Sequence, residues 1–335
     1  MTLTPPPVSC NCAAIGPLRG RNRRRGDVKL SSYAKVNLFL NVLSKRKDGF
    51  HDIETLFERI SLKDELVLSK ISTGIKITTD SHELPTGPKN LVYQAAKLLS
   101  DLYHPKQGVK IKLRKRIPLA AGLGGGSSNA AAALEGLNKL WHLKLSQKKL
   151  LKLGAMLGSD VPFFLLETSF ALGQSRGEIL KPFKAPKAKI WHCLVKPSFG
   201  ISTKEAYANL DNVLLAPPPV LSAKRTNRCG DYKKQVVRLT PKAVNVKILG
   251  RSIEKGDLQA LVKLLTNSLE LTLNKRVTEI LKIKKELTRH GAMRCLLSGS
   301  GPTVFGIYSS QKKALSAARF LRKHKRWQVF AASTF

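Results

Sequence analysis

The sequence predicts an α+β protein built from two domains. Strand-like and helix-like patterns are mixed along the chain without the regular βαβ repeat that a parallel sheet would need. The length of 335 residues is sufficient for two hydrophobic cores, and a linker-like stretch lies between Leu214 and Arg238. We expect an N-terminal arm over residues 1–29, a first domain over 30–180 and a second domain over 181–335.

The composition is that of an ordinary globular protein apart from its charge. Hydrophobic residues make up 42% of the chain, and no apolar run reaches the roughly 18 residues that a membrane span needs. Lys and Arg outnumber Asp and Glu by 59 to 22, a net charge of +37 that favours phosphorylated or polyanionic partners. The lysines are spread along the chain and aromatic residues total 6%, so the pattern does not favour a base-stacking surface for specific nucleic-acid binding.

The first 29 residues are rich in Pro and Arg and lack the apolar core of a secretory signal. We expect a disordered basic arm; a transit peptide is the alternative, although Ser9 is the only serine in this stretch. Five scattered cysteines without a CxxC spacing favour reduced thiols, and seven scattered histidines give no metal-binding spacing. We expect a bacterial cytoplasm, with the plastid stroma as the alternative.

The ordered part is expected to open with a strand from Leu30, in which apolar residues alternate with Lys35 and Asn37. The period of two places those two polar side chains on the same face. Asp48-Gly49 predicts a hairpin turn. Short strands are expected around Leu62–Leu68 and Gly74–Thr79.

A helix and a strand are expected before a glycine-rich segment. The helix, within 89–103, would bury Leu91, Ala95, Leu98 and Leu102 on one face, and the strand would begin at residue 108. A second helix, from Ser128 to about Leu140 and capped by a serine, would follow the glycines.

The second half of the chain predicts a further series of elements. Asp160 stands at a helix N-cap position with Pro162 just inside it. The remaining expected elements are a helix over 146–158, strands after Pro162, helices over Lys255–Thr272 and Val277–His290, a strand–turn–strand unit over 295–308 and a closing helix over 310–323.

The segment "GLGGGSSN" leaves bare backbone directly in front of a helix, which is typical of a phosphate site. It lacks the Gly-Lys-Ser/Thr ending of a Walker A loop, and its glycines are too dense for a dinucleotide fingerprint. Phosphoryl transfer also needs a base for the acceptor hydroxyl and a cation near the developing charge. Asp160 and Lys35 can supply these, although each alone would be read as an ordinary cap and an ordinary surface lysine.

Three segments carry a resemblance to a known superfamily. "PLAAGLGGGSSNAAAAL" and "LSGSGPTVFGIY" are similar to the second and third motifs of the GHMP kinases. "SYAKVNLFLNVLSKRKDGFHDIETLFERISLKDEL", "LGSDVPFFL" and "SRGEIL" resemble the family within it that phosphorylates 4-diphosphocytidyl-2-C-methyl-D-erythritol in the non-mevalonate route to isoprenoids. The resemblance implies a ribosomal-protein-S5-like ATP domain followed by an α+β domain, with ATP and Mg²⁺ as cofactors.

The resemblance also implies roles for individual residues. Asp160 would accept the proton of the 2-hydroxyl and Lys35 would hold the carboxylate and the transferring phosphoryl group. Asn37 would lie beside the acceptor, His51 would bond the cytosine edge and Phe50 would stack on the base. The residues expected to bind ATP are Asn90, Pro118, Leu119, Ala120, Ala121, Gly122, Leu123, Gly124, Gly125, Gly126, Ser127 and Ser128, and Ser128 could also contribute to Mg²⁺ binding.

One departure and two alternatives accompany this interpretation. Phe50 stands where the family usually has tyrosine, so stacking is kept and any bond from the phenol hydroxyl is lost. The alternatives are a GHMP kinase for another alcohol, such as mevalonate or homoserine, and a nucleic-acid-binding protein. We expect a monomer or a weak homodimer without a membrane partner.

Overall fold

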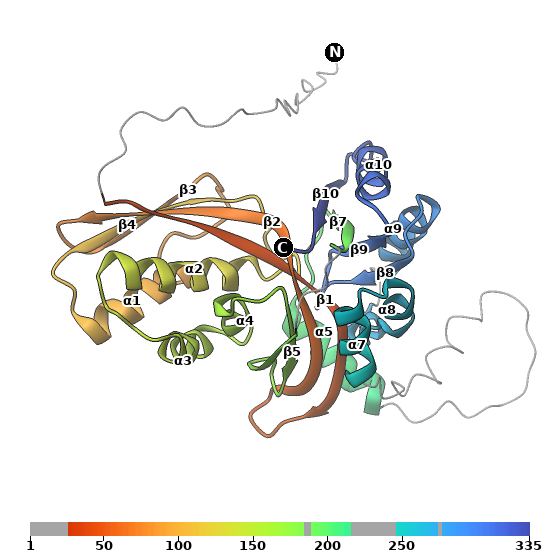
Figure 1. Cartoon of the computed structure of the whole chain (residues 1–335), viewed down its shortest axis with the longest axis horizontal. Helices are drawn as coiled ribbons and strands as arrows, with labels where there is room; N and C mark the ends of the chain where they lie inside the picture. Colours follow the sequence, from red (N-terminus) through yellow and green to blue (C-terminus); the bar gives the residue numbers. More distant parts are fainter. Residues whose placement is uncertain (1–25, 184–188, 216–245, 274–276) are drawn as a thin grey trace, which may run out of the picture.

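The computed structural model describes residues 26–183, 189–215, 246–273 and 277–335. Within them the chain forms two sheets with helices packed against each (Figure 1). Most of the expected arm and of the expected linker lies outside the described residues. The first strand of the described residues begins at Val28, two residues before the predicted Leu30.

The first sheet is organised by a long hairpin. Strands β1 (Val28–Lys45) and β2 (His51–Ile71) pair antiparallel from Lys45 with His51 to Val28 with Leu68, with three register shifts. The turn between them contains Gly49 at φ +83°, as Asp48-Gly49 predicted. The short strand expected around residues 62–68 is the second half of β2. The other strands of this sheet are β3 (Ile75–Thr79), β4 (Gly108–Arg114), β5 (Phe170–Gln174) and β6 (Ile179–Phe183), in the order β3-β4-β2-β5-β6.

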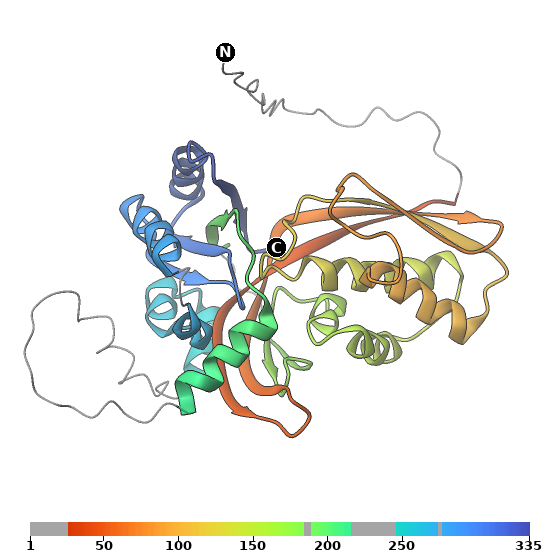
Figure 2. The ribbon, with the colours of Figure 1, turned by 180° about the vertical axis from the view of Figure 1, so that it is seen from behind.

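Four helices pack on one face of the first sheet (Figures 1 and 2). The buried face of helix α1 (Leu91–Tyr103) differs from the prediction. Alanines at positions 95 and 96 face the core together with Val92 and Leu99, whereas Leu102 is 50% exposed. The small alanines let this helix approach its neighbour closely. The helices are α1 (Leu91–Tyr103), α2 (Gly125–Leu140), α3 (Gln147–Leu157) and α4 (Val161–Leu165).

The second sheet has helices on both faces. Its strands, in the order β10-β7-β9-β8, are β7 (Trp191–Pro197), β8 (Arg294–Leu297), β9 (Val304–Tyr308) and β10 (Trp327–Ser333). Helices α9 (Val277–Arg289) and α10 (Gln311–Leu321) cover one face of this sheet. Helices α7 (Val246–Lys255) and α8 (Leu258–Leu264) cover the other face. Helix α5 (Thr203–Leu215) lies beside the β1–β2 hairpin (Figure 2).

The predicted helix over Lys255–Thr272 is wrong: this range contains the last residue of α7, then α8, and then a 3-10 helix. Gly256 ends α7 at φ +69°, and Asp257 then caps α8 by accepting a hydrogen bond from the Ala260 amide at 2.9 Å. A 3-10 helix, η1 (Ser268–Thr272), follows with Asn267 as its own cap. Strands β7 and β10 were not predicted.

The two sheets share one hydrophobic core. Val36, Leu38 and Ile60 of the hairpin are fully buried together with Leu194 and Ile307 of the second sheet. The base of the hairpin is therefore fixed against the second domain, and side chains on β1 are held at the junction.

Candidate active site

The glycine-rich loop, residues 118–127, leads from β4 into α2 at this junction and includes the first three residues of that helix. Gly122 and Gly124 adopt φ +73° and +67°, values that favour glycine, and Ala120 has φ +48°. The expected serine cap is wrong: α2 begins at Gly125, and its N-cap, Gly124, offers no side chain to the first amides. An uncapped helix terminus preceded by bare backbone is suited to an anion.

Neighbouring segments hold the loop at close range. A Cβ on Gly122 would lie 2.1 Å from the Ser298 carbonyl oxygen, and the Ser298 hydroxyl donates to the Gly122 carbonyl at 2.9 Å. The Lys35 amide donates to the Leu123 carbonyl at 3.0 Å. The loop is therefore packed between β1 and the glycine turn of "LSGSG", two segments far apart in the sequence.

The predicted pair, Lys35 and Asp160, meets beside this loop. The Lys35 Nζ atom lies 3.5 Å from the Asp160 Oδ2 atom; the lysine side chain is 5% exposed and the aspartate side chain 33%. Asp160 stands at the N-cap position of α4, as predicted, but its side chain makes no capping hydrogen bond. The carboxylate is therefore free of the helix and faces the ammonium group.

A short chain of hydrogen bonds orients Lys35. Its Nζ atom donates to Asn37 Oδ1 at 2.6 Å, which confirms that the two side chains share a face. Asn37 Nδ2 donates to the Thr55 hydroxyl at 2.7 Å, and that hydroxyl donates to the Phe39 carbonyl at 2.8 Å. Because Thr55 uses its proton on Phe39, the Asn37 amide must present its oxygen to Lys35.

A cleft of about 960 Å³ contains the pair, the loop and the predicted substrate residues. Every loop residue from Pro118 to Ser127 lines it, and so do Lys35, Asn37, Phe50, His51 and Asp160. The cleft therefore brings together fifteen of the seventeen predicted site residues, and their individual roles stay predictions.

Two predicted ATP-binding residues do not line this cleft. Ser128 is 2% exposed and faces a separate cavity; its amide donates to the Gly124 carbonyl and its hydroxyl accepts a bond from Ser32 at 2.7 Å. The physical reason is the earlier start of α2, which turns position 128 inward. Asn90 caps α1, accepting from the Val92 amide at 2.8 Å and donating to the Pro85 carbonyl at 2.6 Å. Its adenine contact stays a prediction.

The far end of the cleft holds residues that the sequence analysis missed. His51 Nε2 lies 2.7 Å from Asp211 Oδ1, and its ring lies 4.9 Å from that of Tyr207. Asp211 also accepts a bond from Lys45 Nζ at 2.7 Å. Tyr207 and Asp211 both come from α5, a helix absent from the predicted elements, so no spacing near His51 pointed to them.

Phe50 is the exposed aromatic at this end. Its ring is 51% exposed and the Arg176 guanidinium lies 4.9 Å from its centroid. An exposed ring beside a polar His51 edge gives this end of the cleft both a stacking surface and hydrogen-bonding groups.

Hydrogen bonding, burial and charge shift the pKa values of Asp211 and Tyr207 at this end of the cleft. Hydrogen bonds from Lys45 and then from His51 lower the pKa of the Asp211 carboxyl. Burial raises the pKa of the Tyr207 phenol, and the negative charge of Asp160 raises it further. Tyr207 therefore stays neutral, and Asp211 stays ionised, at neutral pH.

Among the residues that the structure describes, no group of three or more His, Cys, Asp or Glu side chains is arranged to hold a metal ion. None of the described helices is long and apolar enough to cross a membrane.

Comparisons with known proteins agree with this geometry. Residues 90–168 match the GHMP kinases N terminal domain and residues 251–326 match the GHMP kinases C terminal domain. The chain is 40% identical over 282 residues to a 4-diphosphocytidyl-2-C-methyl-D-erythritol kinase of Geobacillus kaustophilus, covering 84% of this chain and 88% of that one. A second such kinase, from Lachnoclostridium phytofermentans, is 40% identical over 289 residues, covering 86% and 90%.

Solved structures show the same likeness. A crystal structure of 4-(cytidine 5'-diphospho)-2C-methyl-D-erythritol kinase superposes with a TM-score of 0.72 at 30% identity, covering 92% of this chain and all of that one. The L. major mevalonate kinase, at 18% identity, shares the fold with a TM-score of 0.67, covering 92% of this chain and 97% of that one.

The two sheets and the glycine loop at their junction are those of a GHMP kinase. Within that class, the chain belongs to the family of 4-diphosphocytidyl-2-C-methyl-D-erythritol kinases.

Proposed function

We propose that this cleft transfers the γ-phosphoryl group of ATP to the 2-hydroxyl of 4-diphosphocytidyl-2-C-methyl-D-erythritol, the reaction of its family in the non-mevalonate isoprenoid pathway. The observation that carries the proposal is the 3.5 Å approach of Lys35 Nζ to Asp160 Oδ2 within one cleft that also contains the glycine loop. A cation, a base and a phosphate cradle are the parts that positioned phosphoryl transfer requires.

The loop residues 118–127 would bind the ATP phosphates. Backbone N–H groups and the N-terminus of α2 stabilise negative charge there without any acidic residue in the first turn of the helix. The close packing of Gly122 against Ser298 supports a fixed loop, so the amides would not have to reorganise during the reaction.

Asp160 would act as the base. Its carboxylate would take the proton of the 2-hydroxyl as that oxygen forms a bond to the γ-phosphorus, and the bond from the γ-phosphorus to the oxygen bridging it to the β-phosphorus would break to release ADP. Lys35 would keep the carboxylate ionised and neutralise charge on the phosphoryl oxygens, while Asn37 holds the ammonium group in place.

The opposite end of the cleft would bind the cytidine diphosphate part. Phe50 would stack on the cytosine, and His51 would hydrogen-bond its edge with an orientation set by Asp211. Because Phe50 has no hydroxyl, the phenol hydroxyl at this end of the cleft would come from Tyr207, which lies next to His51.

Mg²⁺ would arrive with ATP. The lack of an acidic cluster among the described residues fits a metal ion that is held mainly by the nucleotide phosphates. Asp160, which lines the cleft beside the loop, would be the protein carboxylate available to it. Ser128 does not fit, because its hydroxyl is buried against Ser32. When bound, the ion would neutralise charge on the β- and γ-phosphates.

We also propose that one chain forms a complete site, since both ends of the cleft are lined by residues of the same chain. This supports a catalytically competent monomer or weak homodimer. The scattered cysteines and the bacterial relatives support a bacterial cytoplasm, with the plastid stroma as the alternative.

The test is Asp160→Asn, assayed by ATP consumption with 4-diphosphocytidyl-2-C-methyl-D-erythritol. We expect kcat to fall by about 10²–10⁴-fold, the range for loss of a general base, with ATP binding retained. Asp101→Asn, an exposed aspartate on α1, is the matched control. Turnover of mevalonate or homoserine in place of the cytidylyl substrate by the unmodified chain would contradict the proposal, as would full activity of Asp160→Asn.

A further inference from the structure

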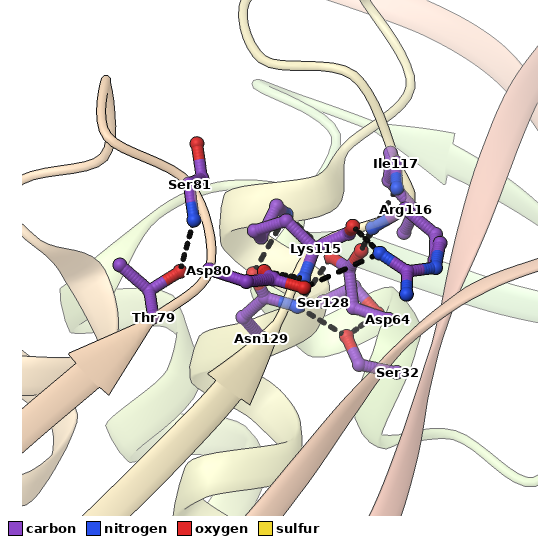
Figure 3. Close-up of polar contacts among 10 residues, drawn as sticks. All are labelled: Ser32, Asp64, Thr79, Asp80, Ser81, Lys115, Arg116, Ile117, Ser128 and Asn129. Carbon is purple, nitrogen blue, oxygen red and sulfur yellow. Dashed lines mark hydrogen bonds and ion pairs between the residues drawn. The ribbon is translucent and has the colours of Figure 1, made fainter. Parts of the chain in front are cut away.

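Asp64 is a fully buried carboxylate that lies outside the cleft and is not explained by the chemistry above. It stands on β2 where the pairing with β1 shifts register and Ser61 and Leu62 have no partner. Figure 3 shows its side chain in a network with residues just before the glycine loop, residues near the start of α2 and Ser32 of β1. A buried carboxylate is costly unless each oxygen is well bonded, so the network must offset its desolvation.

Both oxygens of Asp64 are occupied by donors. Oδ1 accepts bonds from the amides of Arg116 at 2.6 Å and Ile117 at 2.8 Å, immediately before the glycine loop. Oδ2 accepts from the Lys115 ammonium group and from Asn129 Nδ2, the latter at 2.9 Å. Asn129 is the fifth residue of α2, two positions after the last residue of the loop (Figure 3). One carboxylate therefore bonds to the residues on either side of the loop.

Two further bonds make the arrangement rigid. Lys115 Nζ also donates to Asn129 Oδ1 at 3.0 Å, which links the two ends of the loop directly. Asn129 Nδ2 also donates to the Ser32 hydroxyl at 2.8 Å, and Ser32 donates to Ser128. The same network thus turns Ser128 away from the cleft and fixes the first residues of α2 against β1.

The loop needs such a fixation because its own sequence provides little. Glycine-rich backbone has more accessible conformations than any other, and ordering it costs conformational entropy. Amides that bind phosphate must nevertheless be held within about 0.5 Å of their working positions. Fixing both ends of a short loop through buried bonds supplies that order before the nucleotide arrives.

We propose that Asp64 is a positioning residue for ATP: it holds both ends of the glycine loop, residues 118–127, and so determines the affinity for the nucleotide and not for the acceptor. The inference rests on the proposed binding of ATP phosphates by that loop. Lys115 belongs to the Asp64 network and also lines the cleft. Its side chain is 7% exposed, and its Nζ atom would lie 3.4 Å from a Cβ on Gly125.

The chemistry of the four partners makes Asp64→Asn a sharp test. All four groups are donors, and an ionised carboxylate is an acceptor only. The amide of an asparagine at this position would have to turn its N–H₂ group either toward the Arg116 and Ile117 amides or toward Lys115 and Asn129. The substitution keeps the shape of the side chain and leaves Lys115 without its counter-ion. The two ends of the loop therefore lose their fixation, while Lys35 and Ser298 still hold its middle and β2 keeps its packing.

The experiment is steady-state kinetics of the full chain with both substrates, together with calorimetric titration of ADP. For Asp64→Asn we expect the KM for ATP and the Kd for ADP to rise by about tenfold to a hundredfold, the range for small displacements of binding groups, while the KM for the cytidylyl substrate stays within twofold. Hydrogen exchange of the amides in residues 118–127 should be faster than in the unmodified chain. Asp101→Asn is the control for loss of a carboxylate elsewhere.

Unchanged nucleotide affinity in a folded Asp64→Asn chain would overturn the inference, and so would an equal rise in both KM values, which a purely structural role would produce. If Asp64→Asn does not fold, Asn129→Leu decides in the same way, because it removes only the bonds at the α2 end. Turnover and ADP binding by the unmodified chain are measured first, so that failure of the proposed function is seen separately from failure of this inference.

Discussion

Thr55 shows how a residue outside the reaction can control the candidate catalytic pair. Its hydroxyl connects Asn37 to the Phe39 carbonyl, and Asn37 in turn accepts the bond from Lys35. Thr55 is fully buried, so no water can replace it. The position of the Lys35 ammonium group therefore depends on a side chain on the neighbouring strand.

We expect Thr55→Val to lower both activity and stability. The substitution leaves Asn37 Nδ2 and the Phe39 carbonyl without partners in a buried place, at a cost of about 1–3 kcal/mol in the free energy of unfolding. It also releases the Asn37 amide to turn, so kcat should fall. Urea denaturation and initial rates measure the two effects, with the exposed Thr73→Val as control. An unchanged kcat in Thr55→Val would mean that the Asn37 orientation does not matter.

Asp211 sets the state of the opposite end of the cleft. We expect Asp211→Asn to raise the KM for the cytidylyl substrate and to leave the KM for ATP unchanged, because Asp211 bonds His51 and Lys45 far from the loop. A rise in both KM values would contradict the assignment of this end to the cytidine part.

The pH dependence of the Asp211 interaction follows from the direction of its pKa shift. The pKa is lowered in the folded chain, so the interaction contributes stability above the ordinary carboxyl pKa of 3.8 and is lost as the pH falls through the lower folded value. The difference in free energy of unfolding between the unmodified chain and Asp211→Asn should not shrink between pH 8 and about pH 5. Denaturation series at these pH values measure it, and a difference that vanishes by pH 5 would contradict the shift.

At the scale of elements, the sequence predicted those that carry a strong local signal. Asp48-Gly49 predicted the turn of the β1–β2 hairpin, and the strand expected from residue 108 is β4. The start of α2 was misplaced because a serine is the better capping residue in isolation, whereas here the Asp64 network draws Ser128 inward. Local preference gave way to tertiary contacts.

Gly122 is a loop position at which the structure leaves no space for a side chain. Gly122→Ala places a Cβ 2.1 Å from the Ser298 carbonyl oxygen and forces alanine to a φ of +73°. We expect the loop to shift and the KM for ATP to rise by at least about tenfold. The control is Gly87→Ala, since a Cβ at Gly87 would meet nothing within 4 Å. Kinetics that match the control would show that the loop tolerates the displacement.

At the scale of the whole molecule, the two domains meet through a buried polar contact as well as a shared core. His192 Nε2 on β7 lies 2.9 Å from Glu58 Oε2 on β2; both side chains are fully buried, and the two atoms are close without forming a well-aligned hydrogen bond. The Thr334 hydroxyl donates to the other oxygen of Glu58 at 2.7 Å. This contact lies on the same hairpin that carries Lys35.

We expect His192→Leu to cost about 1–3 kcal/mol in the free energy of unfolding, because the buried Glu58 Oε2 atom is left facing an apolar side chain. Urea denaturation measures the change, and the exposed His82→Leu serves as control. A cost below about 0.5 kcal/mol, the size of an ordinary surface substitution, would show that the contact does not stabilise the domain junction.

The same scale explains which parts of the site were predictable. The glycine loop is recognisable because bare backbone before a helix indicates an anion site, whereas Lys35 and Asp160 were recognised only together with the loop and through the family motifs that contain them. Tyr207 and Asp211 are not, because they reach His51 only when α5 of the second domain packs beside the hairpin. The net charge of +37 likewise predicted an anionic partner without indicating where it binds.

The most direct measurement is a crystal structure of the full chain with a non-hydrolysable ATP analogue and 4-diphosphocytidyl-2-C-methyl-D-erythritol. We predict the γ-phosphate between the loop amides and Lys35, with the 2-hydroxyl at about 2.6–3.2 Å from Asp160 and the cytosine beside Phe50 and His51. A γ-phosphate bound away from Gly122 and Lys35, or a 2-hydroxyl out of reach of Asp160, would contradict the account.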